Sequence, residues 1–524
     1  MSDPSPAPRV LLPLVGLVLL FLALYGRAAG FSYVWDDVAT LRDNPAFDRP
    51  LSEGVRITQH GHIDPNLTRL RGVAPSHESY RPLLFLTFAT EVALAGRSAS
   101  VMHATNVVLG VLAILLAFSV ASELLRDRRA GLLVAAVFAL HPLQVESVCY
   151  VSARADVLAG LLALASVALA LRNVPALVPA LVFLASLYAK EAHIGLPLLL
   201  LAGVWLLDRR TLLRPALAML AAIPVYAGLR ALILAGSAPA SVGQVGSVVQ
   251  GALAFPGLVL RYAALFVVPY PLSVVRPLRD GWAIAGWVVF VAIAAAVVWA
   301  LRTRRLCGDR ALAAFALGWA CVTVGPSAIV ARIMGVVADR YAYLPVFGFA
   351  LMVVALARLV PSASSRVLAA GALAWALACV AITAVQIGAW RDERALYTRA
   401  VAAEPGSSAA HYGLGLVHAQ AGHWSEAIVA FERALVLDPT NSRGRNNLGV
   451  AYMNVGRLDE AERTLRAAIV GYELVNFRAW YNLARVQRAR GQRGLACDSL
   501  RRALSINPGY TPALEDARFM CGES

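Results

Sequence analysis

The sequence predicts an all-α protein in two parts, a membrane domain of many helices followed by a solenoid of short helical repeats. Two observations lead to this prediction. Of the 524 residues, 59% are hydrophobic and only 15% are charged, and the apolar residues lie in runs long enough to cross a bilayer. From about residue 390 the chain becomes polar and repeats the same residue types at a fixed spacing.

The apolar runs predict about eleven transmembrane helices in a membrane domain that spans residues 1–388. The first run, residues 10–29, is long and lacks a following cleavage site of the Ala-X-Ala type, so we expect a retained span and not a signal peptide. Two further apolar stretches, 82–95 and 251–269, would break the alternation of charge if they crossed the membrane, and we expect them to lie in the interface. The other predicted spans are residues 101–124, 130–148, 154–171, 175–190, 193–207, 213–235, 282–301, 311–330, 342–360 and 366–388.

Charge predicts the orientation of these spans. The net charge of +15 arises mainly from arginines that follow alternate spans, which is the pattern of cytoplasmic loops. We therefore expect an inner-membrane protein whose first outer loop, residues 31–81, and whose C-terminus are both extracytoplasmic. An even number of spans would instead put the repeats in the cytoplasm. A basic face with interleaved aromatic residues is absent from the sequence, so nucleic acid is not an expected partner.

The C-terminal region, residues 389–524, repeats a pattern of glycine, alanine and proline. The positions of Leu414, Gly415, Gly422, Ala427, Phe431, Ala434 and Pro439 recur from Leu448 to Ala468 and again from Trp480 to Pro508. This is the pattern of the tetratricopeptide repeat, in which glycine allows the turn between two helices and alanine allows their close approach. It predicts three full repeats, a partial repeat upstream, and a solvating cap helix over residues 511–519.

The six cysteines form no Cys-X-X-Cys pair, so a zinc site is not expected. Cys497 and Cys521 both fall in the repeat region, and they could pair if that region is extracytoplasmic. The sequence does not place their two sulfur atoms within bonding distance of each other.

Polar residues that could carry chemistry begin with Asp36 and Asp37, immediately after the first span. Adjacent carboxylates at a membrane surface could bind a cation or orient an acceptor hydroxyl, with one of them acting as a general base. A helix cap or a merely solvated loop is the commoner explanation of such a pair. The same outer loop ends on a polar segment that contains His77, Tyr80 and Arg81, which could equally be an ordinary surface loop.

Further ionisable residues occur at the span ends that the charge pattern places outside. Such groups are costly in a membrane, so they usually face a cavity or one another. Their clustering on one face suggests a site for a lipid phosphate, with Arg154, Lys190 and Arg340 as its cations. A purely structural ion pair between Lys190 and Glu191 is the competing interpretation for that segment. The clusters are His141 and Glu146, then Arg154 and Asp156, then Lys190, Glu191 and His193, then Asp339, Arg340, Tyr341 and Tyr343.

The same segments, in the same order, resemble the transmembrane and tetratricopeptide-repeat-containing family, the O-mannosyltransferases of the eukaryotic endoplasmic reticulum and their bacterial relatives. The matching pieces are Trp35-Asp36-Asp37, the segments 76–83, 141–146 and 154–159, Lys190-Glu191, the segment 269–273, and Asp339 to Pro345. Asp339 replaces the glutamate that is usual in the eukaryotic proteins, and the repeat array is shorter. The arginine-rich composition indicates a bacterial member.

This resemblance implies a GT-C-type membrane glycosyltransferase of about eleven transmembrane helices, which transfers a sugar, commonly mannose, from a polyprenyl-phosphate donor to a protein hydroxyl outside the membrane. It implies that Asp36 is the base, with Asp37 as its partner. It also implies that Arg154, Lys190 and Arg340 hold the donor phosphate. The residues expected to line the site are His77, Tyr80, Arg81, His141, Glu146, Asp156, Glu191 and Tyr343.

No cofactor is required for such an inverting transfer, although Asp36 and Asp37 could recruit a divalent metal ion. The expected partners are the lipid-linked sugar, the bilayer, and an acceptor polypeptide held in the groove of the repeats. A catalytically inert, membrane-anchored scaffold that assembles envelope proteins through its repeats is the alternative. A lipid transporter is less well supported, because it would need polar residues on both sides of the bilayer midplane.

Overall fold

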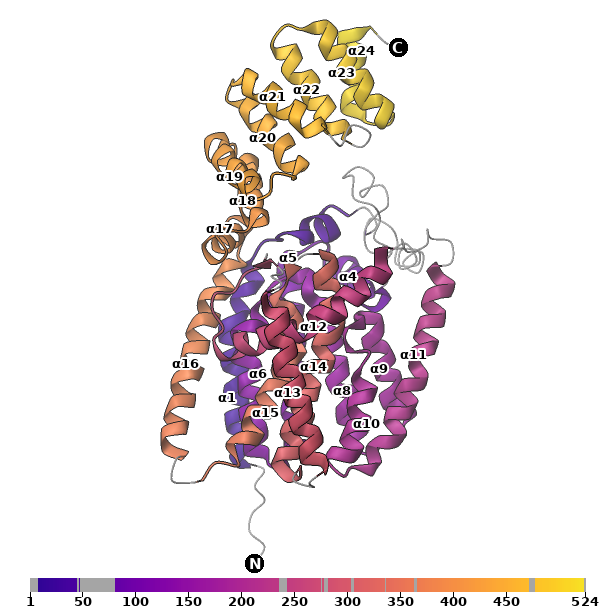
Figure 1. Cartoon of the computed structure of the whole chain (residues 1–524), viewed down its shortest axis with the longest axis vertical. Helices are drawn as coiled ribbons and strands as arrows, with labels where there is room; N and C mark the ends of the chain where they lie inside the picture. Colours follow the sequence, from indigo (N-terminus) through magenta and orange to yellow (C-terminus); the bar gives the residue numbers. More distant parts are fainter. Residues whose placement is uncertain are drawn as a thin grey trace, which may run out of the picture. The chain divides into compact units, whose positions relative to one another are not determined.

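The computed structural model describes residues 8–44, 47, 81–234, 243–274, 276–277, 281–302, 306–334, 336–361, 365–470 and 476–522. The chain divides into two compact units, Met1–Asp392 and Glu393–Ser524 (Figure 1). Both units consist of helices, and the strands among the described residues are only two residues long: β1 (Arg276–Pro277) pairs antiparallel with β2 (Val336–Val337). The predicted all-α fold class, a polytopic membrane domain followed by tetratricopeptide repeats, is confirmed.

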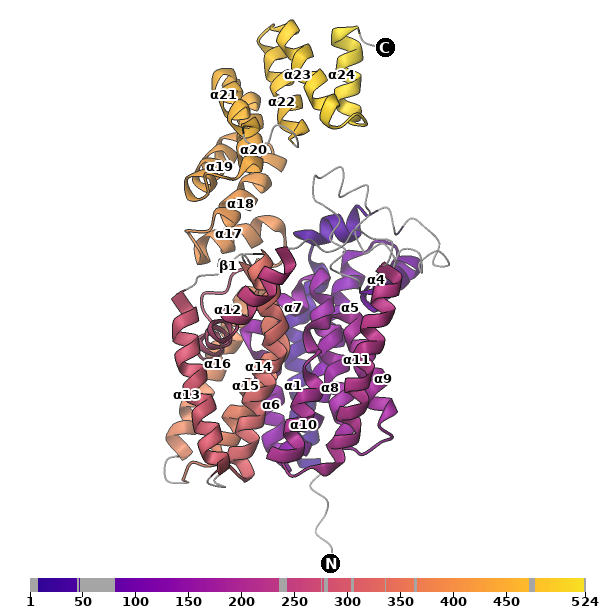
Figure 2. The same cartoon turned by 45° about the vertical axis from the view of Figure 1, so that its right-hand side comes forward.

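The first unit is a bundle of long apolar helices (Figure 2). Its helices are α1 (Pro8–Tyr25), α4 (Pro82–Ala95), α5 (Ala99–Leu125), α6 (Arg128–Leu140), α7 (Val145–Cys149), α8 (Arg154–Leu171), α9 (Leu177–Ala189), α10 (Leu196–Leu206), α11 (Leu213–Leu234), α12 (Gly243–Val267), α13 (Gly281–Arg302), α14 (Gly308–Met334), α15 (Tyr343–Ala357) and α16 (Ser365–Ala389). Short helical turns at Gly26–Gly30, Val38–Arg42, Pro142–Gln144, Val151–Ala153, Glu191–His193, Arg210–Leu212 and Asp339–Ala342 join or extend them.

Fewer helices than predicted are long enough to span a bilayer. Eight segments of the described chain have the required length and hydropathy, and a ninth span results if the pair Arg128–Leu140 and Pro142–Cys149 counts as one. That pair is bent by 56° at His141-Pro142, where proline cannot continue the hydrogen-bonding of the helix. The predicted spans 175–190 and 193–207 correspond to shorter apolar helices, and within α13 the segment Trp282–Ala296 meets only the shorter limit.

The two segments that we expect in the interface differ in length. The segment Val249–Val267 of α12 has the length and hydropathy of a membrane span, whereas Pro82–Ala95 is short, as expected. The prediction for α12 rested on the alternation of charged loops. That alternation constrains the direction of each crossing but does not measure the length of an apolar helix.

The chain leaves the membrane unit at the end of the bundle where its first loop lies. The backbone N–H of Ser32, just beyond α1, donates to the carbonyl oxygen of Arg391, just beyond α16, at 3.1 Å. The residues that follow α1 and those that follow α16 therefore lie side by side at one end of the bundle.

The arginine-rich turns share a different region of the bundle. Arg358, after α15, donates to the carbonyl oxygen of Leu125 at the end of α5 at 2.9 Å and pairs with Asp309 at the start of α14 at 3.5 Å. Arg209 donates to the carbonyl oxygen of Glu123 at 2.5 Å. Turns that follow different predicted spans thus meet, as the alternation of arginine clusters requires. An open pocket between them is lined by Glu123, Arg126, Asp208, Arg209, Arg210 and Thr211.

The second unit is a solenoid of paired helices: α17 (Glu393–Ala403), α18 (Ser408–Gln420), α19 (Trp424–Leu437), α20 (Ser442–Asn454), α21 (Leu458–Ile469), α22 (Phe477–Ala489), α23 (Arg493–Ile506) and α24 (Thr511–Cys521). Gly422 adopts a φ of +75° between α18 and α19, a left-handed conformation that favours glycine. Gly456 and Gly491 repeat this geometry between the next two helix pairs, so the glycines of the sequence pattern are turn residues.

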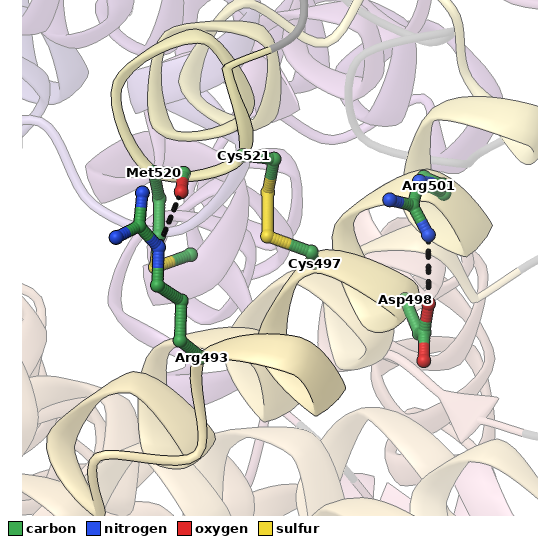
Figure 3. Close-up of a disulfide and its surroundings, with 6 residues drawn as sticks. All are labelled: Arg493, Cys497, Asp498, Arg501, Met520 and Cys521. Atoms are coloured by element: carbon green, nitrogen blue, oxygen red, sulfur yellow. Dashed lines mark hydrogen bonds and ion pairs between the residues drawn. A yellow bond between two sulfur atoms is a disulfide. The ribbon is translucent and has the colours of Figure 1, made fainter.

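The final helix, α24, covers the last apolar face of the repeats. Ala513, Ala517 and Met520 pack on Ala496 and Leu500 of α23, which is the contact expected of a cap helix. A disulfide joins Cys497 of α23 to Cys521 of α24, with the two Cα atoms 5.8 Å apart (Figure 3). Beside it, the guanidinium of Arg493 donates to the carbonyl oxygen of Met520 at 2.7 Å. The cap helix is therefore fastened by apolar packing, a hydrogen bond and a covalent link.

We expect the substitution Gly348→Ala to destabilise the membrane unit, because α15 approaches α14 at this glycine. A Cβ atom at residue 348 would lie 2.8 Å from the backbone oxygen of Ala316 and 2.8 Å from the backbone nitrogen of Ala320. Such overpacking costs about 1–3 kcal/mol, which thermal unfolding in detergent would measure. Gly371→Ala in α16 is the matched control, since no atom lies within 4 Å of its added methyl group. An equal melting temperature in both variants would contradict the close approach.

Candidate active site

The polar segments selected from the sequence meet at the end of the bundle where the first loop follows α1. The segments after α1, around α7, at the start of α8, after α9 and before α15 all contribute side chains to this cluster. These segments are distant in sequence, yet their side chains contact one another through hydrogen bonds and ion pairs. The structure thus brings most of the predicted residues together.

Asp36 presents an exposed carboxylate at this end of the bundle. The phenolic hydroxyl of Tyr150 donates to its Oδ2 atom at 3.2 Å. Because one carboxylate oxygen is held in this way, the group has a defined direction and remains open to the outside. An exposed, oriented carboxylate is the form that a general base requires.

Asp37 has the opposite environment, since its side chain is completely buried. Its Oδ1 atom accepts hydrogen bonds from the backbone N–H of Ser152 at 2.8 Å and from the Ser152 hydroxyl at 2.5 Å. Burial raises the pKa of Asp37 to about 7, although the hydrogen bonds from Ser152 oppose this shift. Asp37 therefore anchors the loop to the turn before α8, and its carboxylate does not face the outside of the bundle.

Trp35 precedes the two carboxylates and has a φ of +55°, which is unusual for a residue with a bulky side chain. Its ring stacks on that of Tyr150, with the centroids 5.6 Å apart. The ring of Tyr150 also stacks on that of Trp390, with the centroids 5.3 Å apart. This aromatic stack supports the backbone conformation that aims Asp36 away from the buried Asp37.

Arg340 contacts the segment of residues 31–37 that contains Asp36 and Asp37, here called the carboxylate loop, through the ring of Trp35. Its guanidinium pairs with Glu146 and lies over the rings of Trp35, Tyr150 and Tyr341, at 5.6, 5.8 and 5.3 Å from their centroids. The side chain of Glu146 is only 3% exposed, whereas that of Arg340 is 20% exposed. Arg340 therefore neutralises a buried carboxylate and still presents part of its guanidinium at the surface of the site.

Lys190 is a second cation at this end of the bundle. Its ammonium donates to Asp156 at 2.5 Å and lies 5.2 Å from the ring centroid of Tyr341, the same ring that contacts Arg340. Lys190 thus pairs with Asp156, and not with Glu191 as the structural interpretation of that segment held. This connects α8 and the end of α9 to the segment before α15.

Arg81 and Glu191 form the edge of the cluster. Glu191 accepts from Arg81 at 3.4 Å through one oxygen and from Arg230 at 2.7 Å through the other. All three side chains are about one quarter exposed. The last residue of the first loop is therefore tied to the segment after α9 and to α11. His77 and Tyr80, which were predicted to line the same loop, lie outside the described residues.

Arg154 does not occupy the position expected of a phosphate-binding residue. Its side chain is fully buried, pairs with Glu91 at 2.9 Å, and donates to Asn106 at 2.7 Å and to the carbonyl oxygen of Met102 at 2.9 Å. These partners occupy its guanidinium within the interior, where it joins α8 to α4 and α5. The sequence places an arginine at the start of a span. It does not show that the side chain points toward α4 and α5.

His141 and Tyr343 are also packed into the bundle. His141 is 1% exposed, bonds the carbonyl oxygen of Phe266 at 2.9 Å, and stacks on the ring of Phe266 with the centroids 5.0 Å apart. Tyr343 is buried against the ring of Phe138 at 5.3 Å. Neither side chain lines the open part of the cluster, so their expected contact with substrate is not supported by this geometry.

The sequence reasoning missed several contributors. Tyr150 and Trp390 were not selected because isolated aromatic residues near span ends are common. Arg230 lies inside an apolar helix, and an intramembrane arginine was a signal that could have identified it. The buried pair of Arg276 with Asp339, at 2.5 Å, joins the segment after α12 to the segment before α15. Asp339 is thereby a structural partner beside Arg340.

Within the ranges that the structure describes, no group of three or more His, Cys, Asp or Glu residues could hold a metal ion. The side chains at this end of the bundle offer a proton acceptor, Asp36, and two cations that can stabilise negative charge, Arg340 and Lys190.

Comparisons with known proteins identify the repeats and a set of curated relatives. Tetratricopeptide repeat family models match residues 381–442 and 446–511, and a second model with the same description matches 418–469. Among curated proteins, the chain is similar to the human protein O-mannosyl-transferase TMTC1, with 34% identity over 143 residues, covering 26% of this chain and 15% of that protein. It is also similar to TMTC3 of the mouse, with 29% identity over 150 residues, covering 29% of this chain and 16% of that protein. The resemblance inferred from the motifs is confirmed at this level.

These matches cover less than one fifth of the length of each relative, so they do not describe the whole of those proteins. Solved structures match over a similar share of the chain. The crystal structure of MamA has 24% identity and a TM-score of 0.23, covering 24% of this chain and 74% of that one. The crystal structure of YrrB, titled a TPR protein with an unusual peptide-binding site, has 20% identity and a TM-score of 0.24, covering 30% and 88%.

We expect the substitution Asp37→Asn to stabilise the protein more at high pH than at low pH. The folded protein keeps the Asp37 proton up to about pH 7, whereas the unfolded chain releases it near the ordinary value of 3.8. The free energy of unfolding of the wild type therefore falls as the pH rises between these two values. Asparagine keeps an oxygen acceptor for Ser152 and does not ionise. The stability difference between variant and wild type should widen by about 2 kcal/mol from pH 5 to pH 8.

Thermal unfolding in detergent at the two pH values would measure this difference. Asp43→Asn is the control, because Asp43 is exposed in the same loop. Its stability relative to the wild type should not change with pH. A constant difference for Asp37→Asn would show that Asp37 is ionised in the folded protein throughout this range.

Proposed function

We propose that this protein is a membrane glycosyltransferase, which transfers mannose from a polyprenyl-phosphate donor to a hydroxyl group of a polypeptide. The observation that carries the proposal is the exposed carboxylate of Asp36, which is oriented by Tyr150, together with the partly exposed guanidinium of Arg340, which lies over the same tyrosine ring. The relatives named as protein O-mannosyl-transferases support the same reaction class.

The reaction would proceed by a single displacement. Asp36 takes the proton of the acceptor hydroxyl as its oxygen attacks the anomeric carbon of the sugar. The bond between that carbon and the phosphate oxygen breaks, and its electron pair remains on the lipid phosphate. The new glycosidic bond forms on the opposite face, so the transfer inverts the configuration of the sugar. No step in this scheme is assigned to a metal ion or a cofactor.

Arg340 and Lys190 are placed to stabilise the leaving phosphate. Negative charge on this group increases in the transition state, and a cation held in advance stabilises it more there than in the substrate. Arg340 uses only part of its five N–H donors on Glu146, so a phosphate oxygen can be accommodated as a further partner. Burial of Glu146 and Asp156 behind the two cations keeps both cations in position.

The repeats supply a surface suited to a polypeptide acceptor. On the first helices of successive repeats, the amide of Asn447 donates to the hydroxyl of Tyr412 at 3.0 Å, and the amide of Asn482 donates to Asn446 at 3.0 Å. Amide groups in such a row have the donors and acceptors that a peptide backbone needs. We therefore assign acceptor binding to this unit, in the groove that helical repeats commonly use.

The disulfide supports an extracytoplasmic location for the repeats. Disulfides persist in the periplasm and are rare in the reducing cytosol of mesophilic organisms. Because the chain leaves the membrane unit at the end of the bundle that carries the first loop, the Asp36 site belongs on the same side as the repeats. The arginine-rich turns would then be cytoplasmic.

We expect the substitution Asp36→Asn to abolish sugar transfer without unfolding the protein. Asparagine can still accept the Tyr150 hydrogen bond, but it cannot take a proton, and loss of a general base commonly costs about 10²–10⁴-fold in rate. The test is transfer of radiolabelled mannose from polyprenyl-phosphate mannose into protein, in membranes that contain the wild type or the variant.

Asp43→Asn is the matched control, since it removes a carboxylate from the same loop and should retain activity. Full activity of Asp36→Asn would exclude Asp36 as the base. If neither protein transfers mannose or any other lipid-linked sugar tested, the result would favour the alternative of an inert scaffold that acts through its repeats.

The proposed orientation predicts which cysteines an impermeant thiol reagent can reach in spheroplasts. Cys307 is exposed between α13 and α14, beside the arginines that are expected to be cytoplasmic. It should be labelled only after the membrane is opened, whereas Cys497 and Cys521 should be labelled in intact spheroplasts once they have been reduced. A Cys307→Ser variant identifies the Cys307 signal. Labelling of Cys307 in intact spheroplasts would contradict the orientation.

A further inference from the structure

One of the aromatic rings that stack behind Asp36 belongs to Trp390, which lies near the C-terminal end of the membrane unit in the sequence. Tyr150 stacks on both Trp35 and Trp390, with interplanar angles of 23° and 25° and centroid distances of 5.6 and 5.3 Å. The hydroxyl of the same tyrosine donates to Asp36. Trp390, which is fully buried, therefore contacts the residue that orients the carboxylate.

Trp390 contributes to this stack by shape alone. Its side chain is fully buried, and its indole Nε1 has no hydrogen-bond partner among the described residues. A buried donor without a partner carries a free-energy cost, so the indole is not held at this position by hydrogen bonding. Its flat surface against the Tyr150 ring is the contact that the structure shows.

A backbone hydrogen bond next to Trp390 holds the start of the carboxylate loop, at Ser32. The N–H of Ser32 donates to the carbonyl oxygen of Arg391 at 3.1 Å. Residues 390 and 391 thus contact the loop in two ways, through the Tyr150 ring behind Asp36 and through the backbone at Ser32. Between these contacts lies Trp35, whose positive φ needs support from its surroundings.

We propose that Trp390 is a positioning residue for Asp36, acting through the ring of Tyr150. The inference rests on the proposed function of Asp36 as the base. Loss of the aromatic surface at residue 390 lets the Tyr150 ring rotate or shift, and its hydroxyl no longer holds the carboxylate in one direction. A misdirected base lowers the rate of transfer without weakening the binding of the donor.

Trp390 lies close in sequence to the boundary between the membrane unit and the repeats. Trp390 directly follows α16, and α17, the first helix of the repeat unit, begins at Glu393. The residues that support the carboxylate loop are therefore the last residues of the membrane unit before the repeats.

The test uses the full-length protein with Trp390→Leu, which removes the aromatic face but keeps apolar volume, and with Trp390→Phe, which restores an aromatic face. We expect Trp390→Leu to lower kcat by about tenfold or more, with less than about a twofold change in the KM for polyprenyl-phosphate mannose. We expect Trp390→Phe to restore kcat, because the indole N–H makes no hydrogen bond. Hydrogen–deuterium exchange of residues 31–37 should increase in the leucine variant only.

Trp319→Leu is the matched control. Trp319 is also fully buried with an unpartnered Nε1, but it packs on Phe347 inside the bundle, with centroids 4.8 Å apart. This variant should lose a similar amount of stability, with kcat and the exchange of residues 31–37 unchanged. Equal effects in the Trp319 and Trp390 variants would overturn the proposal, because they would indicate a general loss of packing. Unchanged kcat and exchange in Trp390→Leu would overturn it as well.

The exchange measurement separates this proposal from the proposed function. If the wild type shows no sugar transfer, the proposed function fails, and faster exchange of residues 31–37 in Trp390→Leu would still establish the support of the loop by Trp390. If transfer occurs but Trp390→Leu changes neither measurement, the proposed function stands and the positioning role of Trp390 fails.

Discussion

The ion pair between Arg340 and Glu146 is the interaction on which the loop end of the bundle depends. Glu146 is almost completely buried, and a carboxylate in that position needs a cation beside it. Arg340 provides the guanidinium and also donates its backbone N–H to Glu146 at 3.2 Å, which joins the segment before α15 to α7. The same guanidinium lies over Trp35 and Tyr150, so the pair also fixes the aromatic rings behind Asp36.

Burial assigns different roles to chemically identical neighbours in this framework. Asp36 and Asp37 are adjacent in the chain, but one carboxylate is exposed and held by Tyr150 and the other is enclosed and held by Ser152. Lys190 and Arg154 differ in the same way: Lys190 lies beside the Arg340 cluster, whereas the interior contacts of Arg154 fully occupy it. The position of each side chain relative to the bundle, and not its residue type, decides whether it is open to the outside or enclosed.

The two units of the chain are stabilised by different means. In the membrane unit, small residues such as Gly348 allow helices to approach, and buried polar side chains are paired with one another. In the repeats, alternating alanines and large apolar residues form a continuous core that includes Ala427, Phe431 and Leu465. Burial of apolar surface from water stabilises this continuous core.

The sequence by itself determined the fold class, the number and phase of the repeats, and the presence of polar segments at the span ends, because these depend on hydropathy and on local turn chemistry. It also identified Asp36, Lys190 and Arg340 as members of one cluster. Only the tertiary structure decided that Arg154, His141 and Tyr343 face the interior, and that Tyr150 and Trp390 support the carboxylate loop. The direction of a side chain at a helix end depends on how the helices pack, and a linear pattern does not contain that information.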